Sequence, residues 1–189
     1  RKNPLDFETL EQKLSLHRDT ELLFEPGTER LYSNYGFIVL GAVLEALAQK
    51  PFASLLNEQI LTPLGPGDSV YPLDPNAPQQ SKRYTYDYRK TQTPVGWVEH
   101  HSPDGGLEAT AYDVLRFYQA LIFEPSRLSI SQDRVSQYFS SDDGYWASYG
   151  GGLGASAAVE IDLDNDWQVI VLANTDQWVA EEISGRIMA

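Results

Sequence analysis

Cysteine is absent from all 189 residues, which removes disulfides, thiolate zinc sites and cysteine nucleophiles from consideration. Basic residues are also scarce, since 14 Lys and Arg stand against 27 Asp and Glu and leave a net charge of −13. That charge disfavours long-range attraction to nucleic acids or anionic membranes. No apolar run approaches the roughly 18 to 20 residues that a transmembrane helix requires. We therefore expect no nucleic-acid partner and no transmembrane segment.

What the chain does contain suits one packed domain. Its hydrophobic content is 42% and its charged content 22%, as in ordinary globular proteins. We predict a single domain over 1–189, with mostly helices and loops over 1–140 and a C-terminal hairpin and helix over 141–189. The chain starts at Arg1 without methionine and enters a helical pattern at once, which we interpret as a cut edge.

The spacing of apolar residues predicts the secondary structure. Helical spacing recurs in five segments, and Pro63 is expected to end the third of them. The period changes to two in the final third, which predicts an antiparallel hairpin. Segment 66–98 is rich in Pro and Tyr, and its tyrosines either line a cleft or pack this loop onto its own domain. The predicted helices are 7–16, 35–50, 53–60, 113–123 and 177–189, and the predicted strands are 155–163 and 167–173.

Two patterns resemble metal sites but lack essential ligands. Asp162, Asp164 and Asp166 alternate as at the start of a calcium loop, but Trp167 and Ala173 stand where glycine and glutamate are required, so we interpret the segment as a hairpin turn. The adjacent His100-His101 pair has no His or Cys partner at ligand spacing. We expect no bound metal.

Three polar residues, Tyr32-Ser33-Asn34, lie between a Pro-Gly turn and the apolar-striped helix predicted over 35–50. Such a tripeptide by itself is explained by capping and packing at a helix start. With F-x-P-G-T before it and Y-G-F-x-x-L-G-x-x-x-E after it, it resembles the second conserved box of the serine β-lactamase and penicillin-binding-protein superfamily. The similarity is to the class C-like branch of esterases, D-amino-acid peptidases and DD-peptidases. Three further segments follow in the family's order: ILTPLG at 60–65, DGGLEATAYD at 104–113, and YGGGLG at 149–154 before a hairpin that ends in VLANT.

The resemblance implies a fold and a chemistry. The fold is an α/β (α+β) sandwich, in which helices flank an antiparallel sheet and the active site lies between the sheet and a helical lobe. In the family, the serine of an S-x-x-K box attacks an ester or amide to form an acyl-enzyme, without metal or organic cofactor. Carried over, Tyr32 is the expected general base and acid, and Asn34 is expected to hydrogen-bond the substrate amide and the active-site lysine. A phenol of pKa about 10 requires an adjacent ammonium for this role.

The third box departs from the family pattern. Tyr149-Gly150-Gly151 stand where the family has Lys or His, then Thr, Ser or Gly, then Gly. Tyr149 offers the substrate one hydrogen bond and no charge, so efficient β-lactam hydrolysis is not expected. Glycines on an edge strand let a substrate approach the backbone, and the Gly152 amide is the expected second donor of an oxyanion hole. The alternative is a glycine-rich strand entry with no role in binding.

The S-x-x-K box is absent, because no serine is followed three residues later by lysine. In the family this box lies far upstream of the tyrosine, whereas only 31 residues precede Tyr32. We therefore expect the middle and C-terminal parts of a hydrolase that lacks the N-terminal strands and nucleophile helix. Such a fragment should be inactive alone, and should self-associate or bind a partner chain carrying the missing segment. The alternative is a non-catalytic binding or scaffold protein of the same fold.

The residues alone identify neither the substrate nor the cellular compartment. The resemblance implies a small ester or amide, or a peptide of the peptidoglycan kind, as the substrate. It also implies a bacterial periplasmic or secreted protein, with the cytoplasm as the alternative.

Overall fold

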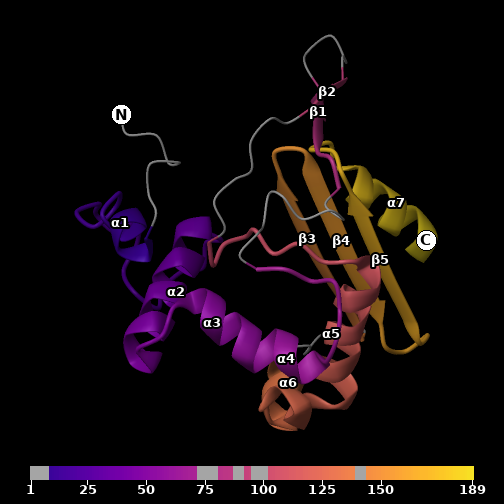
Figure 1. Ribbon diagram of the computed structural model, residues 1–189, viewed down its shortest axis with the longest axis horizontal. Helices are drawn as coiled ribbons and strands as arrows, with labels where there is room; N and C mark the ends of the chain where they lie inside the picture. Colours follow the sequence, from indigo (N-terminus) through magenta and orange to yellow (C-terminus); the bar gives the residue numbers. More distant parts are fainter. Residues whose placement is uncertain (1–8, 72–80, 87–91, 95–101, 139–143) are drawn as a thin grey trace.

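The computed structural model describes residues 9–71, 81–86, 92–94, 102–138 and 144–189 (Figure 1). The start of the first predicted helix and the His100-His101 pair lie outside these ranges. The elements are α1 (Leu10–Leu14), α2 (Asn34–Ala48), α3 (Phe52–Leu56), the π-helical η2 (Asn57–Leu61), α4 (Thr62–Leu64), β1 (Tyr84–Tyr86), β2 (Gln92–Pro94), α5 (Ala111–Phe123), the 3₁₀ segment η3 (Pro125–Leu128), α6 (Gln132–Tyr138), β3 (Tyr145–Gly152), β4 (Ala155–Asp162), β5 (Trp167–Ala173) and α7 (Val179–Met188).

The main sheet is a three-stranded antiparallel meander in the order β3-β4-β5. The predicted hairpin is confirmed, with β4 and β5 at nearly the expected bounds. Its turn explains the alternating aspartates. The Asp162 carboxylate accepts hydrogen bonds from the side chain and the backbone of Asn165, and these bonds hold the pKa of the Asp162 carboxyl below its usual value. The glycine-rich third box forms the whole second half of β3, although glycine is a poor strand former.

Helices cover both faces of this sheet, as the family resemblance implies (Figure 1). On one face, Ile122 of α5 and Val135 of α6 form a buried cluster with Val159 and Ile161 of β4. On the other face, α7 packs along β4 and β5 and buries Ala158 completely. The sheet is therefore the middle layer of a three-layer arrangement.

The helix predicted over 53–60 continues past Pro63, which corrects the expectation that proline ends it. The π segment η2 changes the hydrogen-bond spacing, so that the Thr62 amide donates to the Asn57 carbonyl, five residues earlier. Pro63 then falls in the first turn of α4, where the missing N–H costs little. The helix ends instead at Gly65, whose φ of +84° lies in the region that favours glycine.

The turn after Gly65 is tied to α5 through a buried carboxylate. Asp113 accepts hydrogen bonds from the Asp68 amide at 2.8 Å and the Ser69 hydroxyl at 3.0 Å. Arg116, one turn further along α5, donates to the Pro66 carbonyl at 2.6 Å. These contacts join the turn after the ILTPLG segment to α5, which packs against the sheet.

Asp113→Asn is expected to destabilise the fold at neutral pH by about 1 to 2 kcal/mol. Burial alone would raise the pKa of the Asp113 carboxyl, but its hydrogen bonds and the charge of Arg116 outweigh burial and lower it below 3.8. The ionised carboxylate therefore stabilises the fold above the unfolded-state pKa, and this contribution is lost as the pH falls through the folded-state pKa. The urea midpoints of the variant and the wild type should differ at pH 7, and the difference should shrink as the pH falls through the folded-state pKa of Asp113. The exposed Asp133→Asn variant is the control, and an equal loss in both variants would contradict the prediction.

Two described parts of segment 66–98 are anchored to the rest of the chain. Tyr71 is 7% exposed and its ring stands against Phe52, so it packs the loop instead of lining a cleft. Burial first, and then the nearby carboxylates, raise the pKa of Tyr71 to about 12. Further along, the Tyr84 amide donates to the Asn174 carbonyl at 3.0 Å, which holds β1 at the end of β5. Arg83 and Glu108 form a half-buried ion pair at 2.5 Å.

The apolar side of α2 is only partly covered. Leu40 and Leu47 are 60% and 78% exposed, although Gly41 lies so close to Pro103 that a Cβ atom would clash with the proline ring. Figure 1 shows α1 and α2 to one side of the sheet. Within the described ranges, no single helix is long and apolar enough to cross a membrane; α2 meets that test only as a pair with the segment Phe52–Leu64, which is bent from it by 84°.

Candidate active site

The second box stands at the N-terminus of α2, and each of its residues has a distinct position. Ser33 is the N-cap, with extended backbone and a hydroxyl that accepts a hydrogen bond from the Gly36 amide at 3.4 Å. Tyr32 precedes the cap and is 74% exposed, with its ring 5.7 Å from that of Phe37. Asn34 is the first helical residue. The serine therefore has a local structural role, whereas the catalytic roles of Tyr32 and Asn34 stay predictions.

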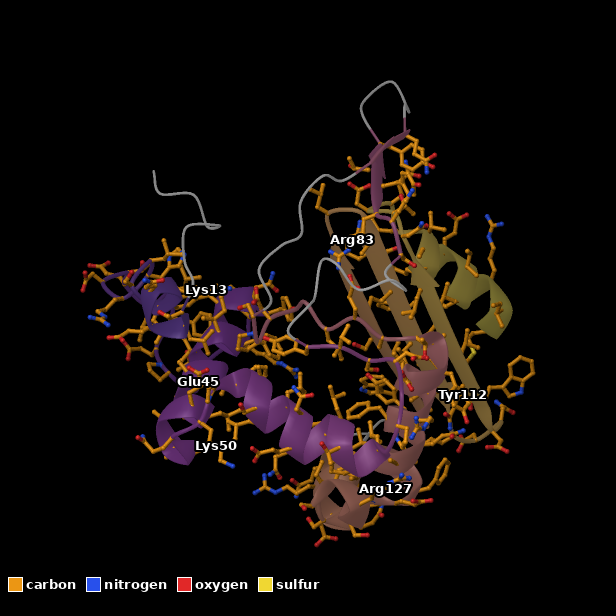
Figure 2. All side chains as sticks on the ribbon, viewed as in Figure 1. Lys13, Glu45, Lys50, Arg83, Tyr112 and Arg127 are labelled. Carbon is orange, nitrogen blue, oxygen red and sulfur yellow. The ribbon has the colours of Figure 1, made fainter. Side chains whose placement is uncertain are left out.

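Lys50 does not place its ammonium group beside the Tyr32 phenol. That lysine follows the C-terminus of α2, at the opposite end of a helix about 22 Å long. Its ammonium pairs with Glu58 at 2.6 Å, and Figure 2 shows Lys50 at the lower end of the α2 region. A general base at Tyr32 therefore needs a cation from another part of the protein, as the resemblance implies.

The third box lies along the open edge of the sheet. Among the described strands, β3 pairs only with β4, so its other edge has no strand partner. Gly150, Gly151 and Gly152 are exposed. A Cβ atom added at Gly150 would meet nothing within 4 Å, and one at Gly151 would make only ordinary contact with Trp178. The packing of the described residues does not require glycine at these two positions. Close approach of a substrate to the backbone is a reason for glycine there.

The Tyr149 side chain is hydrogen-bonded to a buried carboxylate. Its hydroxyl donates to Glu160 Oε1 at 3.2 Å, although the residue is 44% exposed. Burial first, and the charge of Glu160 with it, raise the pKa of the Tyr149 phenol above its usual value, despite an opposing hydrogen bond from Tyr145. The phenol is therefore neutral at physiological pH. Its role toward substrate stays a prediction.

Glu160 is a residue that the sequence analysis missed. It is 1% exposed in the middle of β4, and it accepts hydrogen bonds from the hydroxyls of Tyr145 at 2.5 Å, Tyr149 at 3.2 Å and Ser184. Three donors from β3 and α7 thus satisfy one buried carboxylate. The sequence offered one sign of it, namely a glutamate in the middle of an apolar strand. A charged residue at such a position is seldom buried without partners.

Known proteins share sequence and fold with this chain. The family model described as Beta-lactamase matches residues 2–187. The D-alanyl-D-alanine-carboxypeptidase/endopeptidase AmpH of Escherichia coli K12 is 29% identical over 114 residues, which are 59% of this chain and 28% of AmpH.

Two solved structures share the fold. A penicillin-binding protein from Bacillus halodurans matches 98% of this chain with a TM-score of 0.84 and 19% identity. An octameric penicillin-binding-protein homologue from Pyrococcus abyssi matches all of it with a TM-score of 0.82 and 18% identity. The match spans 64% of the first solved chain and 49% of the second, so this chain corresponds to part of each relative.

Proposed function

The chain belongs to the beta-lactamase family, and from this premise we propose that it is part of a serine hydrolase that cleaves an ester or amide through an acyl-enzyme. The second box carries the proposal. Ser33 caps α2 and thereby holds Tyr32 and Asn34 on either side of the helix start, where the Tyr32 side chain is exposed. If the second box had only a structural role, the Ser33 cap alone would be sufficient.

The proposed reaction assigns a step to each residue. A serine hydroxyl attacks the substrate carbonyl while Tyr32, ionised by a neighbouring ammonium, takes the hydroxyl proton. Tyr32 then returns that proton to the leaving amine or alcohol, and water later releases the acyl group. Asn34 hydrogen-bonds the substrate amide, and the Gly152 amide donates to the oxyanion. Gly150 and Gly151 let the substrate lie against β3.

The nucleophile is proposed to come from polypeptide outside these 189 residues, either a further segment of the same chain or a partner. The absence of an S-x-x-K sequence supports this. The exposed leucines of α2 support it too, because apolar surface of this kind is ordinarily covered by protein. The Pyrococcus abyssi homologue is octameric, which is compatible with self-association.

A non-catalytic binding or scaffold protein is the second candidate. The observation that favours it is Tyr149, whose phenol bonds to Glu160 at the position where the family carries a catalytic-site cation. A protein of this kind would keep the fold and bind ligands without forming an acyl-enzyme.

Labelling with a fluorophosphonate probe followed by denaturing intact-mass spectrometry distinguishes these candidates. The probe reacts with activated serines, so the expected adduct lies on a co-purifying polypeptide or on the complete encoded chain, and not on the 189 residues alone. An adduct on the 21.2 kDa chain would contradict the proposed external nucleophile. No adduct on any species, including the complete encoded polypeptide, would favour the scaffold protein; heat-denatured protein is the control.

A further inference from the structure

The two faces of β3 present different side chains, and the register shows which face each residue occupies. Directly paired residues of an antiparallel sheet share a face, and successive residues alternate. Ser148 pairs with Val159, which belongs to the buried cluster beneath α5 and α6. Trp146, two residues earlier on the same face, contacts Tyr118 of α5 at 5.1 Å between ring centroids. Ser148 therefore lies on the face of the sheet that packs against α5.

Tyr149 lies on the opposite face. Its hydroxyl donates to Glu160, which also accepts a hydrogen bond from Ser184 of α7. Glu160 alternates with Val159 and so points to the α7 side. Tyr145, four residues before Tyr149 and on the same face, donates to the other carboxylate oxygen. This cluster of hydroxyls around Glu160 holds the Tyr149 phenol away from the α5 face.

The α5 face of β3 changes character along the strand. Trp146 is half-buried against α5, whereas Ser148, Gly150 and Gly152 beyond it are exposed. Leu172 of β5, which lies on this same face through the pairing of both strands with Ala157, is 40% exposed. Among the side chains of this uncovered stretch of β3, Ser148 carries the only hydrogen-bonding group, because the other two residues are glycine.

We propose that Ser148, which directly precedes the third box, and not Tyr149, is the β3 side chain that faces the substrate, and that its uncharged hydroxyl makes the site specific for neutral esters and amides. The proposal rests on the proposed function, since it names the substrate class of that active site. Tyr149 then has a structural role, joining β3 to Glu160.

The chemistry follows from the donor. A hydroxyl supplies one O–H and accepts through its lone pairs, so it can hydrogen-bond a carbonyl or amide without a charge. It cannot offset the negative charge of a substrate carboxylate as a Lys or His cation does. The net charge of −13 adds to this preference, because an acidic protein repels anionic ligands at long range.

The test uses the complete encoded polypeptide and two esters that differ in one charge, p-nitrophenyl valerate and mono-p-nitrophenyl glutarate. The wild type should prefer the neutral ester. Ser148→Lys is expected to raise kcat/KM for the carboxylate ester relative to the neutral one by about tenfold or more, mainly through KM. Ser148→Ala should raise KM for the neutral ester by about threefold to tenfold with little change in kcat. Tyr149→Phe should leave the ratio of the two esters unchanged and lower the urea midpoint.

Two outcomes would overturn the proposal. An ester ratio that responds to Tyr149→Phe but to neither Ser148 variant would return the substrate role to Tyr149. If none of the variants changes the ratio of the kcat/KM values for the two esters, the side chains of β3 do not determine specificity. Fluorophosphonate labelling of the same preparations separates these results from a failure of the proposed function: unlabelled protein would refute the hydrolase and this inference together, whereas labelled protein with an unaltered ratio would refute the inference alone.

Discussion

Glu160→Ala is expected to lower the free energy of unfolding by about 3 kcal/mol, the largest stability effect of any single substitution proposed for this chain. The variant removes the shared acceptor of Tyr145, Tyr149 and Ser184. Their hydroxyls would then lie beside a cavity without their shared charged acceptor, and the loss of a charge-assisted hydrogen bond in a buried site is costly. The site is 1% exposed, so water can replace the carboxylate only after the structure opens.

Urea unfolding followed by circular dichroism measures this effect. Glu182→Gln is the matched control, because Glu182 is a glutamate of α7 whose ion pair with Arg186 is well exposed, and its loss should cost less than about 0.5 kcal/mol. Glu160→Gln keeps one acceptor oxygen and should fall between the two. Equal midpoints for Glu160→Ala and Glu182→Gln would show that the cluster does not stabilise the fold.

Tyr32→Phe is expected to reduce kcat of the complete hydrolase by about 10² to 10⁴-fold, the range for loss of a general acid–base group. The substitution removes only the phenolic oxygen, and the ring contact with Phe37 survives. On the 189-residue chain, where Tyr32 is 74% exposed, the same substitution should leave the urea midpoint unchanged. KM should change much less than kcat, since proton transfer is required in the transition state and not for binding.

Steady-state hydrolysis of a neutral p-nitrophenyl ester, with single-turnover measurement of acylation, tests this prediction. Tyr112→Phe is the control, as Tyr112 is 68% exposed and its phenylalanine variant keeps an aromatic ring 5.9 Å from the Arg116 guanidinium. Loss of activity in both variants would indicate a general effect on the fold. Full activity of Tyr32→Phe would exclude the tyrosine as the proton carrier.

The sequence predicted the second box of the site better than the surroundings of the third box. The position of Ser33 as the cap of α2 follows from local chemistry, because a serine before an apolar-striped helix satisfies free amides wherever that helix packs. Glu160 was not identified from the sequence, since its partners come from β3 and α7 and are 11 to 24 residues distant. The resemblance placed the glycines of the third box on an edge strand, but the residue pattern did not predict the bounds of β3, because glycine lacks the side chains that produce a strand pattern.

The sequence by itself determined the family, the confirmed hairpin of β4 and β5, and the helix that follows Tyr32-Ser33-Asn34. These features depend on motif order, on periodicity and on caps, all of which act over a few residues. Only the tertiary structure decided that the helix at Pro63 continues to Leu64, and that Tyr149 faces α7 while Ser148 faces the side of α5. The physical reason is that strand register and burial are set by contacts between distant segments, and a shift of one residue exchanges the two faces of a strand.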